Sequence, residues 1–109
     1  MQENKISFGL SEQTIHAIKC VFHAHHSIEK VLIYGSRAKG NFKNGSDIDL
    51  TIISASTSTD ELILIANELD DLMLPYKIDL SLMRQIENND LLDHIQRIGI
   101  IFYQRKPSK

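Results

Sequence analysis

The fold of this chain is decided by VLIYGSRAKGNFKNGSDIDLTII, residues 31–53. The first four residues are apolar, and a short apolar run closed by a glycine is typical of a strand buried on both faces. In residues 47–53 polar and apolar side chains alternate, and this period of two is typical of a strand with one buried face. The alternation puts two carboxylates, Asp47 and Asp49, on the polar face. The stretch therefore predicts two strands joined by a glycine-rich loop.

The start of this loop suits a phosphate group. Gly35 allows a ligand to approach the backbone closely, and Ser36 opens a short helical turn whose N–H groups are free for phosphate oxygens. Arg37 and Lys39 add positive charge beside the turn, and we expect both to contact the same ligand. A tight turn with solvated basic side chains explains these residues equally well. The segment is not a Walker P-loop, because Gly40 is not followed by Lys and Ser or Thr.

The pair Asp47 and Asp49 predicts a metal site. Two carboxylates ~5 Å apart on one strand face repel each other by about 3 kcal/mol at an effective dielectric constant near 20, so a counter-cation is expected. Such oxygen ligands suit Mg²⁺ or Mn²⁺, whose coordination is completed by water and substrate phosphates. An Asp-x-Asp motif alone also occurs in surface loops and in metal-dependent glycosyltransferases. The discriminating feature here is Gly-Ser, ten residues, and then Asp-x-Asp.

A later aspartate extends this site. Residues 77–82 alternate in the same way, and Asp79 lies on their polar side. We expect it to supply the third carboxylate of a two-metal site for phosphoryl or nucleotidyl transfer. In this interpretation Asp47 and Asp49 hold the metal bound to the triphosphate, while Asp79 completes the second metal and helps to deprotonate the acceptor.

The remaining elements follow from helical spacing and capping residues. Ser11 is a plausible N-cap for a helix over residues 12–25, and a helix over 88–98 followed by a strand over 100–103 closes the chain. Between them, Ser58 and Glu61 form a capping box for a helix stopped by Pro75. Its apolar stripe comprises Leu62, Ile65, Ala66, Leu69, Leu72 and Met73. The polar and basic tail, residues 104–109, is expected to fray.

The length and composition of the chain limit which classes of protein it can belong to. A chain of 109 residues forms one domain, residues 1–109, and is long enough to bury a core without disulfides. Twelve basic against fourteen acidic residues argue against broad nucleic-acid binding. The single cysteine, Cys20, forms no internal disulfide, and neither a signal peptide nor a membrane span is evident, so we expect a cytoplasmic protein.

A histidine cluster ends the first expected helix. His23, His25 and His26 lie where this helix is expected to end, and histidine is favoured at helix C-termini. We therefore do not interpret the cluster as a metal site.

The motif resembles the signature of the DNA polymerase beta-like nucleotidyltransferases, and within them the minimal nucleotidyltransferases (MNT), which are similar in length. Their pattern is Gly-Ser-x-Ala-x-Gly, a spacer, and then Ser-Asp-x-Asp-Leu. It is matched here by Gly35, Ser36, Ala38, Gly40, Ser46, Asp47, Asp49 and Leu50. The later strand aspartate of the family is matched by Asp79. The motif covers sixteen residues, while the order of helices and strands agrees over nearly the whole chain.

The resemblance implies an α+β fold, with a small mixed sheet flanked by helices. It also implies two Mg²⁺ ions, with Mn²⁺ as the alternative, held by Asp47, Asp49 and Asp79. Gly35 and Ser36 hold the triphosphate of an NTP, expected to be ATP, and a nucleoside monophosphate is transferred with release of pyrophosphate. Family members of this size resemble antitoxins whose partner is a helical HEPN protein, which they inactivate by adenylylating a tyrosine.

The size of the chain also suggests a partner. Larger relatives, such as aminoglycoside nucleotidyltransferases, carry additional helical mass that closes over the nucleotide and acceptor. Here a second protein or a second copy of the chain is expected to supply that wall. Two other functions stay open at this stage: a binding module that neutralises a partner by masking it, and a sensor that binds an NTP without transferring it.

Overall fold

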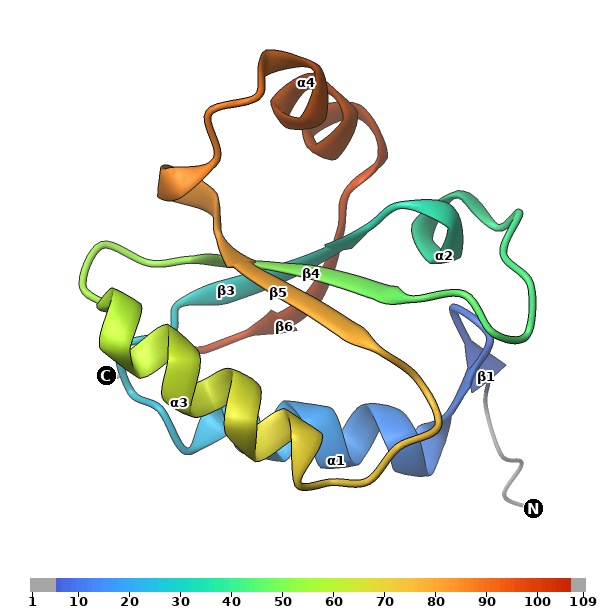
Figure 1. Ribbon diagram of the computed structural model, residues 1–109, viewed down its shortest axis with the longest axis horizontal. Helices are drawn as coiled ribbons and strands as arrows, with labels where there is room; N and C mark the ends of the chain where they lie inside the picture. Colours follow the sequence, from blue (N-terminus) through green and yellow to red (C-terminus); the bar gives the residue numbers. More distant parts are fainter. Residues whose placement is uncertain (1–5, 107–109) are drawn as a thin grey trace.

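The computed structural model describes residues 6–106 of the chain. Six strands, four α-helices and one short 3₁₀ helix make up this part, and Figure 1 shows their arrangement. In chain order they are β1 (Ile6–Ser7), β2 (Leu10–Ser11), α1 (Glu12–His23), β3 (Lys30–Tyr34), α2 (Ser36–Lys39), β4 (Ile48–Ile53), α3 (Thr59–Asp70), β5 (Ile78–Leu82), the 3₁₀ helix Met83–Gln85, α4 (Asn89–Ile98) and β6 (Ile100–Gln104).

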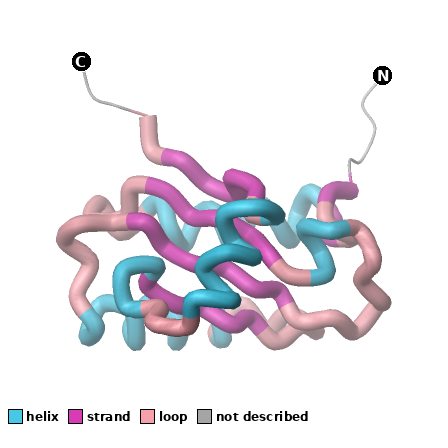
Figure 2. Tube along the Cα trace, turned by 90° about the horizontal axis from the view of Figure 1, so that it is seen from above, coloured by secondary structure: helices cyan, strands magenta, loops and turns pink. Residues whose placement is uncertain are grey.

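The main sheet is mixed, as expected. Its strand order is β5-β4-β3-β6, with β3 antiparallel to both β4 and β6, and with β4 parallel to β5. Helices α1 and α3 cover one face, while α4 lies over the other (Figure 1). Figure 2 shows α4 in front of the strands, with α1 and α3 behind them. The expected α+β fold with a mixed sheet flanked by helices is confirmed.

The core lies between the sheet and the pair α1 and α3. The apolar residues of β4, Ile48, Leu50 and Ile52, are 0–1% exposed and belong to this core, so the polar positions between them face α4. Strand β3 is buried almost throughout, although Leu32 is only half-buried. The period of two in residues 47–53 therefore directs Asp49 to the α4 face, as predicted.

Two details of α3 differ from the expectation. Ser58 caps the helix by accepting from the Glu61 N–H at 3.1 Å, but the Glu61 carboxylate accepts from Ser27 instead of returning to the cap. Helix α3 ends at Asp70, and Met73 is 85% exposed with φ 58°. Including Met73 in the apolar stripe was wrong, because the left-handed turn after the helix directs its side chain into solvent.

The two ends of the described chain also differ from the expectation. The hairpin β1–β2 was not predicted, because strands of two residues are too short to show a period. The expected fraying is wrong for Gln104, which belongs to β6, and for Arg105. The Arg105 guanidinium donates to backbone carbonyls at the end of α1 and in the following turn. These carbonyls belong to Phe22, His23, His25 and Ile28. Residues 107–109 of the expected tail lie outside the described residues.

Candidate active site

Three polar side chains form a row across the α4 face of the sheet. Strand pairing places Asp49 of β4 directly beside Asp79 of β5, and Tyr34 of β3 on the other side of Asp49. Residues paired in register across neighbouring strands project to the same face. Asp47 precedes β4 by one residue and is exposed. The structure therefore brings the two predicted strand carboxylates, Asp49 and Asp79, side by side.

The surroundings of Asp49 disfavour its ionised form. Burial raises the pKa of the Asp49 carboxyl above its usual value, and the charges of Asp79 and Asp47 raise it further, while His94 acts in the opposite direction. Burial also raises the pKa of the Tyr34 hydroxyl, and the charge of Asp79 adds to this effect. The site concentrates negative charge on a half-buried surface.

Within residues 6–106, Asp47, Asp49 and Asp79 form no ion pair with a basic side chain. The ion pairs found there are those of His25 with Glu61 and Glu68, and of Arg97 with Asp93. No group of three His, Cys, Asp or Glu side chains in the described chain is close enough to form a ready metal site. By their chemistry, the oxygens of Asp49 and Asp79 fit a hard divalent cation, and Asp47 is near enough to influence Asp49.

Gly35 lies directly against Asp49. A Cβ at this position would be 2.2 Å from Oδ2 of Asp49, and the backbone has φ 76° and ψ −159°, a conformation that only glycine adopts readily. The Gly35 N–H donates to Nε2 of His94 at 3.1 Å. Ser36 begins the short helix α2 and is half-buried. The predicted loop start thus adjoins the carboxylates.

The structure gives Arg37 a structural position instead of the expected place at a phosphate. Its side chain is buried at 2% exposure, and its guanidinium lies 5.2 Å from the ring centre of Phe42 and 4.8 Å from that of Tyr76. All of its nitrogens donate to backbone carbonyls. These are Phe8 at 2.8 Å, Asn44 at 3.3 Å, and Ser46 at 2.9 and 3.1 Å. Lys39 is exposed, and its contact with phosphate stays a prediction.

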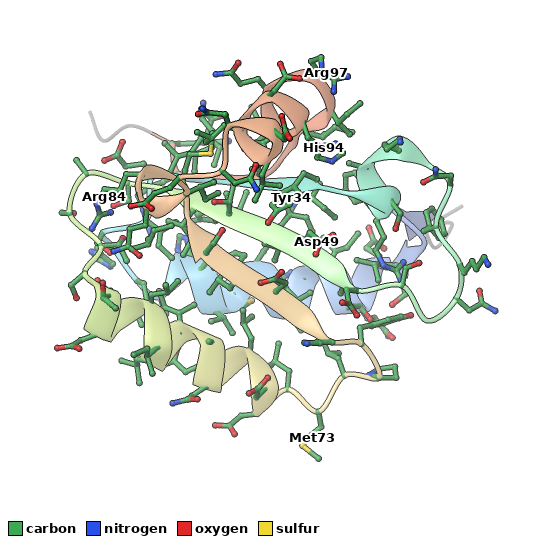
Figure 3. The ribbon with its side chains drawn as sticks, turned by 45° about the horizontal axis from the view of Figure 1, so that its top comes forward. Tyr34, Asp49, Met73, Arg84, His94 and Arg97 are labelled. Carbon is green, nitrogen blue, oxygen red and sulfur yellow. The ribbon has the colours of Figure 1, made fainter. Side chains whose placement is uncertain are left out.

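Sequence analysis missed two residues of this site. Tyr34 was taken as part of the core, and it is indeed only 7% exposed, but it also borders Asp49. His94 comes from α4 and lies edge-on to the Tyr34 ring, with centroids 6.1 Å apart (Figure 3). Nothing in the sequence around His94 indicates this place, because it depends on how α4 crosses the sheet.

Comparison with known families assigns the chain. The family model described as polymerase beta, nucleotidyltransferase, matches residues 16–108. The chain belongs to this family. The family is the one indicated by the Gly-Ser and Asp-x-Asp motif, so that prediction is confirmed. No curated protein matches the sequence.

Solved structures support the nucleotidyltransferase fold. One similar chain comes from a toxin-antitoxin complex with AMP-PNP, with a TM-score of 0.67 and 18% identity, covering 84% of this chain and 74% of that one. Another comes from a Shewanella oneidensis complex of a tri-AMPylated HEPN toxin with an MNT antitoxin, with a TM-score of 0.63 and 16% identity, covering 86% and 72%. A third, from a MntA-HepT toxin-antitoxin complex, has a TM-score of 0.62 and 16% identity, covering 86% and 73%. At these identities the likeness concerns the fold.

None of the helices within residues 6–106 has the length and apolar character needed to cross a bilayer.

Proposed function

We propose that the protein transfers AMP from ATP to a hydroxyl group of a helical HEPN-type partner and acts as its antitoxin in the cytoplasm. The observation that carries this proposal is the in-register pair Asp49 and Asp79, which adjoins Gly35 and forms no ion pair with a basic side chain within the described residues. Family membership supports the reaction class. Similar folds in complexes with AMP-PNP and with an AMPylated HEPN toxin support the donor and the partner.

Each residue has a role in this proposal. Asp47, Asp49 and Asp79 would hold two Mg²⁺ ions, or Mn²⁺, which when bound neutralise triphosphate charge and polarise the α-phosphate. The Gly35 amide and the Ser36 hydroxyl bind triphosphate oxygens, and Lys39 adds positive charge at the rim. Asp79 accepts the proton of the acceptor hydroxyl. The acceptor oxygen bonds to the α-phosphorus as the bond to the β-phosphate oxygen breaks, and pyrophosphate leaves.

The exposure of the site supports a partner. Asp79 and Asp47 are both exposed on the α4 face, so the described chain leaves the acceptor side of the site open to water. Transfer to a protein hydroxyl is favoured when water is excluded. The partner, or a second copy of this chain, would complete the wall.

The test is label transfer from α-labelled ATP with Mg²⁺ into host soluble proteins and into a candidate HEPN-type partner. We expect a labelled protein with the wild type and with the control Asp60→Asn, a change on the exposed side of α3, and none with Asp49→Asn. With the purified candidate partner alone, γ-labelled ATP should give no labelled protein, because the γ-phosphate leaves in pyrophosphate.

Failure would point to one of two other functions. If the folded protein transfers no label from any of the four α-labelled NTPs, the proposal that it is an enzyme is wrong. Metal-dependent NTP binding without product would then indicate a sensor. Neutralisation of a partner that persists in Asp49→Asn would indicate masking.

A further inference from the structure

The Gly35 N–H already has a partner within the chain. His94 Nε2 accepts this hydrogen at 3.1 Å, across 59 residues of sequence. An imidazole nitrogen accepts only when it carries no proton, so the remaining proton of a neutral His94 is on Nδ1. The edge contact with Tyr34 holds the ring in this orientation (Figure 3).

The proposed function requires the same N–H for a triphosphate oxygen. A single backbone N–H makes one good hydrogen bond, so His94 and a phosphate oxygen exclude each other at Gly35. The opposite side of the Gly35 α-carbon is closed by the Asp49 carboxylate. A nucleotide can therefore use this amide only after His94 leaves it.

The position of His94 on α4 allows its side chain to leave the Gly35 amide. Its neighbour Ile95 is 1% exposed and anchors α4, whereas His94 itself is only half-buried. Rotation about the two side-chain torsions of His94 frees the amide while α4 stays in place.

We propose that His94 gates the phosphate subsite, holding the Gly35 amide in the nucleotide-free protein and yielding it to a triphosphate oxygen. This inference rests on the proposed nucleotide binding. A phosphate oxygen is a charged acceptor and makes a stronger hydrogen bond than an imidazole. His94 thereby favours polyphosphates over ligands that bind through neutral groups and lowers the affinity for all of them.

The test compares binding of AMP-PNP with Mg²⁺ by calorimetry. His94→Ala removes the competing acceptor and is expected to tighten binding roughly two- to tenfold, the effect of one hydrogen bond. His94→Gln keeps an acceptor and should bind like the wild type. Gln96→Ala, an exposed position on the same helix, is the matched control. In nucleotide-free protein, the Gly35 amide should exchange with solvent faster in His94→Ala than in the wild type.

The results separate this inference from the proposed function. Unchanged or weaker binding by His94→Ala, with binding by the wild type intact, overturns the gate alone. No binding by any variant overturns both proposals. If His94→Ala fails to fold, the NMR resonance of Nε2 of His94 in the wild type tests the gate instead. A shift of this resonance when AMP-PNP binds supports the gate, and an unchanged resonance overturns it.

Discussion

The contact between Gly35 and Asp49 sets the geometry of the site at the scale of single residues. Oδ2 of Asp49 occupies the space that any side chain at position 35 would need. The same contact contributes to the burial that raises the pKa of the Asp49 carboxyl, to which the charges of Asp79 and Asp47 add. The same pair of residues thus combines the close approach of the Gly35 backbone with the unfavourable burial of the Asp49 charge.

Gly35→Ala should abolish nucleotidyl transfer and destabilise the fold by roughly 1–3 kcal/mol, because the new Cβ meets Asp49 and the positive φ is strained. Urea unfolding and label transfer measure the two effects. Gly45→Ala is the control, since a Cβ there meets nothing within 4 Å. Equal stability of the two variants would contradict the contact described here.

Asp49→Asn should raise the melting temperature in metal-free buffer at neutral pH while abolishing transfer. The raised pKa of Asp49 means that its ionised form is less favourable in the folded state than in the unfolded state. The destabilisation sets in as the pH rises through this pKa, so the gain of the variant should disappear in acid. Calorimetry of the wild type, Asp49→Asn and the control Asp60→Asn at neutral and at acid pH measures this difference. A melting temperature of Asp49→Asn below that of the wild type at neutral pH would refute the prediction.

The buried Arg37 and the half-buried His25 join elements that are distant in sequence. Arg37 of α2 connects the β1–β2 hairpin, through the Phe8 carbonyl, to the loop before β4. His25, just after α1, bonds to two carboxylates of α3, Glu61 at 3.0 Å and Glu68 at 2.7 Å. Both side chains are polar residues whose function is to hold elements together.

Arg37→Met should destabilise the fold by about 2–4 kcal/mol, because the buried guanidinium is lost and the carbonyls of Phe8, Asn44 and Ser46 lose their donors. Lys39→Met, an exposed change on the same short helix, should leave stability nearly unchanged. Urea unfolding of both variants measures the difference. Similar losses in the two variants would contradict the structural role of Arg37.

The contacts of His25 with Glu61 and Glu68, called the His25 clamp below, should make the stability of the fold depend on pH. Burial lowers the pKa of His25, but the hydrogen bonds and charges of Glu68 and Glu61 outweigh this, so the net shift is upward from 6.5. The stabilisation is therefore complete below pH 6.5 and is lost as the pH rises through the higher folded-state pKa. Since the hydrogen bonds from Ser27 and His25 lower the pKa of Glu61, its contribution persists until the pH falls through that lowered value.

Unfolding free energies at about pH 6 and about pH 9 test this dependence. The wild type should lose more stability than His25→Gln between the two values, while His26→Gln, at the exposed neighbouring position, should behave like the wild type. Parallel curves for the wild type and His25→Gln would show that the clamp carries no charge.

The whole molecule has two unequal faces. On one face α1 and α3 enclose the core with the sheet, and on the other α4 contributes Ile95 as its one fully buried residue. The candidate site residues Tyr34, Asp49, Asp79 and His94 lie on the face that α4 covers. The core on the α1 and α3 side therefore positions the strands, whereas α4, which carries His94, has a single buried residue.

Native-state hydrogen exchange should resolve this asymmetry. We expect the amides of α4 to open with a free energy at least about 1 kcal/mol below that of β3 and β4, since few apolar contacts hold the helix. Exchange followed by NMR at low denaturant measures both values. Identical opening energies for α4 and the central strands would show a single cooperative unit.

Periodicity in the sequence was sufficient to determine most of the elements. The alternation in residues 47–53 and 77–82 placed Asp49 and Asp79 on polar strand faces, and Ser11, Ser58 and the residues around them located helix starts within a residue or two. Each of these signals is local, because a strand or helix repeats its environment every two or 3.6 residues. The Gly-Ser and Asp-x-Asp spacing indicated the family for the same reason.

Only the tertiary structure decided which residues from distant segments of the chain contact each other. The parallel pairing of β4 with β5 sets Asp49 beside Asp79, α4 brings His94 to Gly35, and α3 supplies the two acidic partners of His25. Arg37 shows the same limit, because its charge suggested phosphate while packing directed it to backbone carbonyls. A side chain's type is local information, whereas its partner depends on how the elements pack, and no local period records that.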